Sequence, residues 1–373
     1  MFAAKNFFLA GGVLLIAPQN TVAPVVSGTA VAGQTLSCTI GTWTGSPPIT
    51  FAYQWQAGTT NIPSATSSTY VISSAYAGQT IRCVVTATNG AGSTSANSNS
   101  TGVVILPVTT TVEYLVIAGG GGGGCIGGGA GAGGYRTASG FSVASGSPIT
   151  VTVGGGGAGS FSQTAAGSNG SNSVFSSITS TAGGGGASNN ANANSGGSGG
   201  GGQWFYAFGN GTAGQGNNGG SGANNAPYYS AGGGGGAGAV GGSSSGATSG
   251  GGAVGTASSI TGSSITRAGG GSGGWRAFTG ASGTAPAAGG GGAGTGDNTN
   301  GGAGTANTGG GGGGGGYGGG ILSNGGGAGG SGVVILRYPD SFAAATSTTG
   351  SPSITVTGGY RIYQWNGSGS ITF

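Results

Sequence analysis

Hydrophobic and polar residues alternate in short segments over residues 23–106. Clusters of turn-forming residues, such as Gly45-Ser46-Pro47-Pro48 and Ala57-Gly58-Thr59, separate one segment from the next. Alternation with a period of two is the pattern of a half-buried strand. The pattern therefore predicts a single β-sandwich over this part of the chain. Its clearest strand segments are QTLSCTIG, FAYQWQAG, STYVISS and TIRCVVTATNG.

Two apolar, β-branched segments enclose the longest part of the chain. They are VEYLVIAG at residues 112–119 and GVVILRY at residues 332–338, and their composition favours strands that pair with each other. The sequence thus predicts a domain over residues 112–338 that is closed by one small basal sheet. Three further strand-like segments join that sheet, at residues 135–143, 147–155 and 171–181.

Glycine dominates the interior of that domain. The chain contains 101 glycines, and long glycine runs recur between residues 119 and 316. Such runs have almost no side chains to bury, and glycine loses more backbone freedom on ordering than any other residue, so a disordered linker is the first alternative. However, large aromatic residues interrupt the runs, whereas a flexible linker lacks them. A folded domain is therefore favoured.

A glycine run can fold without side chains as a polyproline-II-like helix. That helix has three residues per turn and rises about 3.1 Å per residue, which gives residues 309–316 a length of roughly 25 Å. With no Cβ on any face, such helices pack at backbone distance, and each N–H and C=O bonds to a neighbouring helix. We therefore expect a sandwich of glycine helices with connecting loops at both ends.

Residues 339–373 return to alternation. The segments SITVT, YRIYQW and SITF are separated by Gly358-Gly359 and Asn366-Gly367, and Asn-Gly is a strong hairpin signal. The pattern predicts a three-stranded β-meander, which either covers an edge of the basal sheet or pairs with a partner subunit. Residues 107–111, which begin with a proline, form a short linker after the sandwich.

Residues 1–22 contain one charged residue, Lys5, which is followed by an apolar run over residues 7–17. The run is too short to span a bilayer as a helix. It is either a docking peptide buried in a partner assembly, since exposed apolar segments mark interfaces, or an uncleaved secretory signal. We favour the docking peptide. Its candidate contact residues are Phe2, Phe7, Phe8, Leu9, Leu14, Leu15 and Ile16.

Charge and composition argue against several classes of function. The net charge is +4, only 3% of residues are charged, and the seven basic residues are scattered, so no basic patch marks a nucleic-acid surface. Histidine is absent, and the three acids Glu113, Asp297 and Asp340 are far apart in sequence. Cys125 stands alone among glycines, and we expect it to be inert. We expect no catalysis, no metal, no cofactor and no membrane insertion.

Loops rich in Asn, Gly and aromatic residues interrupt the later glycine runs, at residues 203–231 and 275–288. Rigid aromatics among adaptable polar residues are the composition of recognition loops, and a scaffold that fixes loop ends suits a binding surface. The alternative is that the aromatics merely cap the open ends of the glycine sandwich. The candidate receptor-binding residues are Trp204, Phe205, Tyr206, Phe208, Tyr228, Tyr229, Trp275 and Phe278.

Cys38, Trp55 and Cys83 stand in the order and rough spacing of an immunoglobulin-like domain. This part of the chain thus resembles the immunoglobulin-like modules of bacterial surface proteins and bacteriophage virion proteins, although Ile81 stands where a tyrosine corner would place Tyr. The resemblance implies that the two cysteines face each other across a core tryptophan. They form either a structural disulfide or a pair of reduced, buried thiols.

Five motifs carry a second resemblance: VEYLVIAGGGGGG, GGAGGYRTASGFSV, SPITVTVGGGGAG, GGSGVVILRYP and the ending GGYRIYQWNGSGSITF. With the glycine runs between them, they make residues 112–373 similar to a glycine-rich domain of bacteriophage tail-fibre and adhesin proteins. The resemblance implies a polyglycine-II sandwich whose distal loops bind receptors on the host surface. Residues 203–231 and 275–288 match those loops in placement and composition.

Together, these patterns predict an all-β plus polyglycine-II protein: an immunoglobulin-like β-sandwich, then a glycine-helix sandwich with a basal β-sheet and a C-terminal β-meander. We expect a non-enzymatic appendage on the virion exterior, anchored by its N-terminus to other virion structural proteins, with a host glycan or outer-membrane protein as receptor. The alternatives are a head-fibre or capsid decoration protein without a specific receptor and a bacterial cell-surface adhesin. The sequence leaves a homotrimer open.

Overall fold

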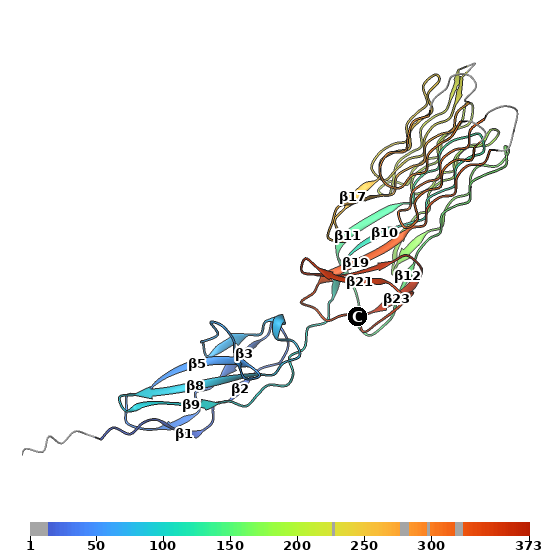
Figure 1. Cartoon of the computed structure of the whole chain (residues 1–373). Helices are drawn as coiled ribbons and strands as arrows, with labels where there is room; N and C mark the ends of the chain where they lie inside the picture. The colour runs from blue at the N-terminus through green and yellow to red at the C-terminus, as the bar shows by residue number, and fades with distance from the viewer. Residues whose placement is uncertain (1–13, 226–227, 277–282, 297–298, 318–323) are drawn as a thin grey trace, which may run out of the picture. The chain divides into compact units, whose positions relative to one another are not determined.

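The computed structural model describes residues 14–225, 228–276, 283–296, 299–317 and 324–373 (Figure 1). Over these residues the chain is all-β, with antiparallel sheets and one 3-10 turn at Ser74–Tyr76, which confirms the predicted class. The chain divides into two compact units. The smaller unit is Met1–Pro107 with Ser341–Ala343, and the larger unit is Val108–Asp340 with Ala344–Phe373.

The smaller unit contains sheets of two, three and four strands, ordered β1-β4, β2-β3-β7 and β6-β5-β8-β9. In β8, buried and half-buried residues alternate from Ile81 to Ala87, the period of two that the sequence shows. The strands are β1 (Gln19–Val22), β2 (Val26–Ser27), β3 (Thr35–Cys38), β4 (Thr42–Thr44), β5 (Thr50–Ala57), β6 (Thr60–Asn61), β7 (Thr69–Val71), β8 (Ile81–Asn89) and β9 (Gly92–Asn97).

Trp55 on β5 lies at the centre of the core of the smaller unit and is fully buried. Its indole N–H donates a hydrogen bond of 2.8 Å to the carbonyl of Ser67, and the ring of Tyr70 lies 5.7 Å away. Cys83 on β8 is its direct partner across the strand pair. The tryptophan therefore buries its large apolar surface while its polar atom keeps a partner.

Cys38 on β3 and Cys83 on β8 are buried and are free thiols. The thiol of Cys38 donates a hydrogen bond of 3.3 Å to the carbonyl of Thr39, and that of Cys83 donates one of 3.8 Å to the carbonyl of Val84. Burial in the apolar core, and to a smaller extent the neighbouring thiol of Cys38, raises the pKa of Cys83 to about 12, and burial also raises the pKa of Cys38. The structure thus has the reduced pair, and the disulfide stays a prediction.

Neither thiol should react with iodoacetamide at pH 8 while the smaller unit is folded, because the thiolate is the reactive form and burial disfavours it. The folded pKa of Cys83 lies above the ordinary value of 9.0, so its contribution to stability is present below about pH 9 and is lost as the pH rises toward 12. Mass spectrometry of alkylated peptides, with and without denaturant, measures the labelling. Rapid labelling of the native protein would contradict this burial.

Two five-stranded sheets lie in the larger unit, ordered β11-β10-β19-β22-β21 and β14-β13-β12-β23-β20. The two enclosing segments pair with each other, as predicted: β10 and β19 are antiparallel, with Glu113 opposite Arg337. Their strands are β10 (Thr111–Ile117), β11 (Tyr135–Ser142), β12 (Ile149–Thr152), β13 (Ser173–Phe175), β14 (Ile178–Ser180), β19 (Val333–Pro339), β20 (Ser347–Thr349), β21 (Ser353–Thr357), β22 (Tyr360–Trp365) and β23 (Gly369–Thr372).

The C-terminal segment differs from the predicted three-stranded meander. β21 pairs with β22, and β22 with β19, but β23 joins the other sheet between β12 and β20. The physical reason is burial: Ile371 and Phe373 are buried, and the ring of Phe373 lies 5.6 Å from that of Tyr338. The single basal sheet that the sequence predicted is likewise two sheets, with segments 147–155 and 171–181 in the second.

The remaining named strands form two short hairpins among the glycine-rich segments. One is β15 (Ala223–Asn225) with β16 (Tyr228–Ser230), and the other is β17 (Thr256–Ser258) with β18 (Ile265–Arg267). Elsewhere in the larger unit, the glycine-rich segments run side by side away from the sheets and are joined by turns (Figure 1). The order of these segments in space follows from their backbone hydrogen bonds.

Residues 119–124, which follow β10, are buried among these segments. Their N–H groups donate hydrogen bonds of 2.8–3.1 Å, and donors three residues apart reach the same neighbouring segment. Gly119 and Gly122, for example, donate to Ser171 and Ser168. The three accepting segments are residues 128–131, 168–171 and 327–330.

The carbonyl groups of residues 119–124 accept hydrogen bonds of 2.9–3.0 Å from three other neighbours, again at every third residue. Gly183 and Gly186 donate to Gly119 and Gly122, so the numbers rise together and these neighbours run parallel, whereas the three accepting neighbours run antiparallel. The segment therefore has six neighbours, and both backbone polar groups of every residue are paired. The donating segments are residues 157–160, 183–186 and 312–315.

The close approach of these segments depends on missing side chains. A Cβ atom added to Gly123 would overlap the carbonyl group of Gly313, and one added to Gly120 would overlap that of Gly310. Gly155 lies in another glycine run but differs, because nothing lies within 4 Å of the position that its Cβ would take. Glycine is therefore a steric requirement at the contact points and not throughout the runs.

Gly123→Ala should destabilise the larger unit by about 3 kcal/mol or more, because overpacking a rigid interior costs about 1–3 kcal/mol and the clash here is with backbone. Gly155→Ala is the matched control and should be neutral or slightly stabilising, since its Cβ would meet open space. Thermal unfolding followed by circular dichroism measures both variants. Equal melting temperatures would contradict the requirement.

Candidate functional site

The ends of the glycine-rich segments bring distant aromatic residues together. Trp204 lies in a turn closed by a bridge between Gln203 and Tyr206, and Tyr229 lies on β16. Further bridges join Ser230 to Trp275 and Arg276 to Tyr317. We call five of these residues, which line one hollow in the surface, the tip cluster: Trp204, Tyr229, Trp275, Arg276 and Tyr317.

Ring contacts join four residues of the tip cluster, Trp204, Tyr229, Arg276 and Tyr317. The rings of Trp204 and Tyr229 lie 4.8 Å apart at an angle of 50°. The guanidinium carbon of Arg276 lies 5.2 Å from the ring centre of Tyr229 and 4.8 Å from that of Tyr317. Such cation–π contacts are each worth about 0.5–1 kcal/mol when exposed and more when desolvated. The guanidinium therefore has a fixed position against the rings of two other segments.

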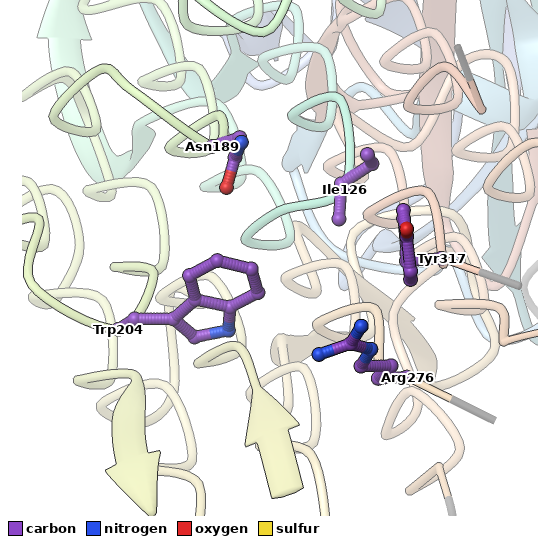
Figure 2. Close-up of a pocket in the computed structure, with 5 residues that line it drawn as sticks. All are labelled: Ile126, Asn189, Trp204, Arg276 and Tyr317. Carbon is purple, nitrogen blue, oxygen red and sulfur yellow. The ribbon is translucent and has the colours of Figure 1, made fainter. Parts of the chain in front are cut away.

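A cavity of about 210 Å³ opens beside the tip cluster. Figure 2 shows its lining side chains around a central space, with the indole of Trp204 and the guanidinium of Arg276 facing Ile126 and Asn189 across it. Among the described residues that line the cavity, Arg276 is the charged one. The site thus combines an aromatic face, a carboxamide and a positive charge.

The turn after residues 119–124 forms the base of the site. The buried carboxamide of Gln203 donates a hydrogen bond of 2.7 Å to the carbonyl of Ile126. The backbone N–H of Cys125 donates a hydrogen bond of 2.9 Å to the hydroxyl of Ser188, which is also buried. Burial raises the pKa of the Cys125 thiol, which opposes formation of a reactive thiolate. This base is therefore held by side chains from two other turns.

The predicted receptor-binding residues fall into two groups. Trp204, Tyr229 and Trp275 belong to the tip cluster, whereas Phe205 and Phe208 are exposed, with exposed fractions of 76% and 39%. Half-buried Tyr206 donates from its hydroxyl group to the carboxamide oxygen of Asn190 at 3.4 Å, and Tyr228 lies on β16. Phe278 lies outside the described residues.

Four residues that line the cavity were not among the predicted receptor-binding residues: Ile126, Asn189, Arg276 and Tyr317. Arg276 follows Trp275 directly, and Tyr317 ends the longest glycine run, so both had a weak signal from their position in the sequence. Ile126 and Asn189 had none, because they reach the cavity only through the order in which the glycine-rich segments pack.

Part of the predicted docking segment is described. Leu14, Leu15 and Ile16 have exposed fractions of 88%, 45% and 62%. The backbone N–H of Ile16 donates a hydrogen bond of 2.9 Å to the hydroxyl of Ser46, so the segment lies along the smaller unit and keeps apolar side chains in solvent. The other predicted docking residues lie outside the described part of the chain: Phe2, Phe7, Phe8 and Leu9.

Other kinds of site have little support in the described residues. No group of three or more His, Cys, Asp or Glu side chains lies close enough there to hold a metal ion. Glu113 is paired with Arg337, whose Nε lies 2.7 Å from its carboxylate. No helix in the described part of the chain is long and apolar enough to cross a bilayer.

A family model described as a glycine-rich domain matches residues 98–339, which is more than half of the chain. The chain therefore belongs to this glycine-rich domain family. No curated protein and no solved structure matches the chain.

Ser188→Ala should destabilise the larger unit by about 1–3 kcal/mol, because it leaves the buried N–H of Cys125 without its acceptor. Ser198→Ala is the matched control: Ser198 is equally buried, but its hydroxyl has no hydrogen-bond partner among the described residues, so its loss should be neutral or stabilising. Denaturant unfolding measures both changes. A larger loss for Ser198→Ala would show that the turn is held in another way.

Proposed function

We propose that this protein is a non-enzymatic, fibre- or adhesin-type appendage on the exterior of a bacteriophage virion. Its N-terminal segment anchors it to other virion structural proteins, and the tip cluster with the neighbouring exposed aromatics binds a receptor on the host surface. The observation that carries the proposal is the tip cluster itself: aromatic side chains gathered on turns of a backbone-bonded scaffold. Aromatic residues and arginine are the residues most enriched at binding hot spots.

The scaffold is a polyglycine-II sandwich in this proposal. The support is the period of three in the hydrogen bonds of residues 119–124, since a polyproline-II-like helix has three residues per turn. Six neighbours per segment also fit a helix without side chains, because such a helix presents N–H and C=O groups in every direction. The scaffold therefore fixes the segment ends that carry the tip residues.

The smaller unit acts as an immunoglobulin-like spacer. The support is the central Trp55 with Cys83 beside it on the neighbouring strand and Cys38 on a strand of a different sheet. This is the arrangement of the two cysteines and the core tryptophan in immunoglobulin-like domains. A spacer of this kind needs stability and no chemistry of its own.

The N-terminal segment supplies the anchor. Leu14 and Ile16 keep large apolar side chains in solvent, although burial of such a side chain is worth about 1.5–3 kcal/mol. A partner surface that covers them would gain this energy. Other structural proteins of the particle are the proposed partners.

Phe205→Ser should reduce binding of the fluorescent full-length protein to susceptible bacterial cells by at least tenfold, because loss of an aromatic hot spot costs roughly 2 kcal/mol. Phe205 is 76% exposed, so the fold should not change. Ile354→Ser is the control, since Ile354 is 50% exposed on the sheet strand β21 and should leave binding unchanged. Flow cytometry on a panel of bacterial strains measures the effect.

Binding to no strain would contradict receptor recognition and favour a head-fibre or decoration protein. Immunogold labelling with an antibody against the smaller unit tests the location on the particle. Labelling of bacterial cells without phage would instead identify a cell-surface adhesin.

A further inference from the structure

The cavity beside the tip cluster has the size of a site for one small ring. Its volume of about 210 Å³ is below the range of about 300–1,000 Å³ that is typical for drug-sized ligands. A protein partner, in contrast, needs roughly 800 Å² of surface on each side of a stable interface. The cavity itself is therefore suited to a single unit of a larger, repeating ligand.

Trp204 gives this cavity a surface for a sugar ring. The face of an aromatic ring is electron-rich, so it attracts the slightly positive C–H groups on the apolar side of a pyranose. Trp204 has a φ of +24°, a conformation that is uncommon for a residue with a side chain. Its contact with Tyr229, at 4.8 Å between ring centres, fixes the indole at the cavity. The carboxamide of Asn189 donates to the side-chain oxygen of Gln163 at 2.8 Å and accepts from the side chain of Gln203 at 3.4 Å, and a carboxamide has a second N–H that can bond to a hydroxyl group.

Arg276 makes the cavity selective for negative charge. Its guanidinium carbon lies about as close to the ring of Tyr317, at 4.8 Å, as to that of Tyr229, at 5.2 Å. The N–H donors of a guanidinium lie in its plane, in a fork that matches the two oxygens of a carboxylate. Figure 2 shows the guanidinium directed toward the space beside the indole of Trp204. A ring that stacks on the indole would thus bring an attached carboxylate to Arg276.

We propose that the cavity binds one hexuronic acid residue of a cell-surface polysaccharide, with the sugar ring on Trp204 and its carboxylate on Arg276. This inference rests on the proposed function as a host-surface binder and adds the chemical class of the receptor. A neutral hexose would use the indole and Asn189 but would bring no carboxylate to the guanidinium of Arg276. The carboxylate is therefore the group that determines specificity.

The test uses the full-length protein with galacturonic acid, glucuronic acid and an oligogalacturonate, against galactose and glucose as neutral counterparts. Tryptophan fluorescence titration and saturation-transfer NMR measure the affinities. We expect the acids to bind at least tenfold more tightly than the neutral sugars. Arg276→Gln should remove this difference. Arg136→Gln is the matched control, because it changes the net charge equally on β11, where Arg136 donates to the carbonyl of Thr179, and it should keep the difference.

A second variant tests the position of the ligand. Trp204→Phe keeps an aromatic face but removes the indole, so binding should persist by NMR while the fluorescence response falls, with the remainder coming from Trp275 in the same cluster. A fluorescence response as large as that of the unmodified protein would place the ligand elsewhere and overturn the proposal. Circular dichroism confirms that each variant is folded before its affinity is compared.

Three other results would also overturn the proposal: equal affinity for acidic and neutral sugars, unchanged selectivity in Arg276→Gln, or no saturable binding of any of the acids. The cell-binding assay separates these failures from failure of the proposed function. If cells are bound through Phe205 but the acids are not, the protein is a surface binder with another receptor, such as an outer-membrane protein. If no cells are bound, receptor recognition itself is wrong.

Discussion

The hydrogen bond between the backbones of neighbouring glycine-rich segments is the interaction on which the larger unit depends. One such bond adds only about 1 kcal/mol net, but a buried peptide group without a partner costs about 1–3 kcal/mol. In residues 119–124 every N–H and C=O has a partner, and the partners lie in six different segments. A strand in a sheet bonds to at most two neighbours. Absence of side chains thus allows the chain to replace an apolar core with a network of peptide groups.

This network also explains how the candidate site arises. Ile126, Asn189, Trp204, Arg276 and Tyr317 come from five separate parts of the chain, and none of them is close to another in sequence. Each part adjoins a glycine-rich segment whose position is fixed by backbone bonds. Exposed side chains at these ends, such as Phe205, can then vary without disturbing the interior. The aromatic and charged residues therefore gather where the interior ends.

The sequence predicted strands better than it predicted their partners. The enclosing segments that became β10 and β19 were found because both are apolar along most of their length, and a fully buried pair needs such a pattern. The destination of β23 was missed, because alternation in SITF shows that a strand exists but does not show which edge will bury Ile371 and Phe373. Asn366-Gly367 correctly marked a turn, and the turn leads to a different sheet.

The arrangement of the glycine-rich segments could not be predicted at all, because identical residues carry no information about register. Any part of residues 309–316 could bond to any other glycine run by local chemistry alone. The composition of the tip was predictable, since Trp204, Tyr229 and Trp275 stand out among glycines. Arg276 acquires its setting only when Tyr229 and Tyr317 are brought to it from distant parts of the chain.

The period of three has a consequence for how such a molecule can change in length. Three residues make one turn of about 9 Å. Three glycines added at the end of a segment would therefore lengthen it by one turn and leave its N–H and C=O groups directed at the same neighbouring segments. One or two added residues would instead rotate every following peptide group away from its partners. Segments of this kind can therefore grow or shrink only in whole turns, which would raise or lower one outer loop relative to the others by a fixed step.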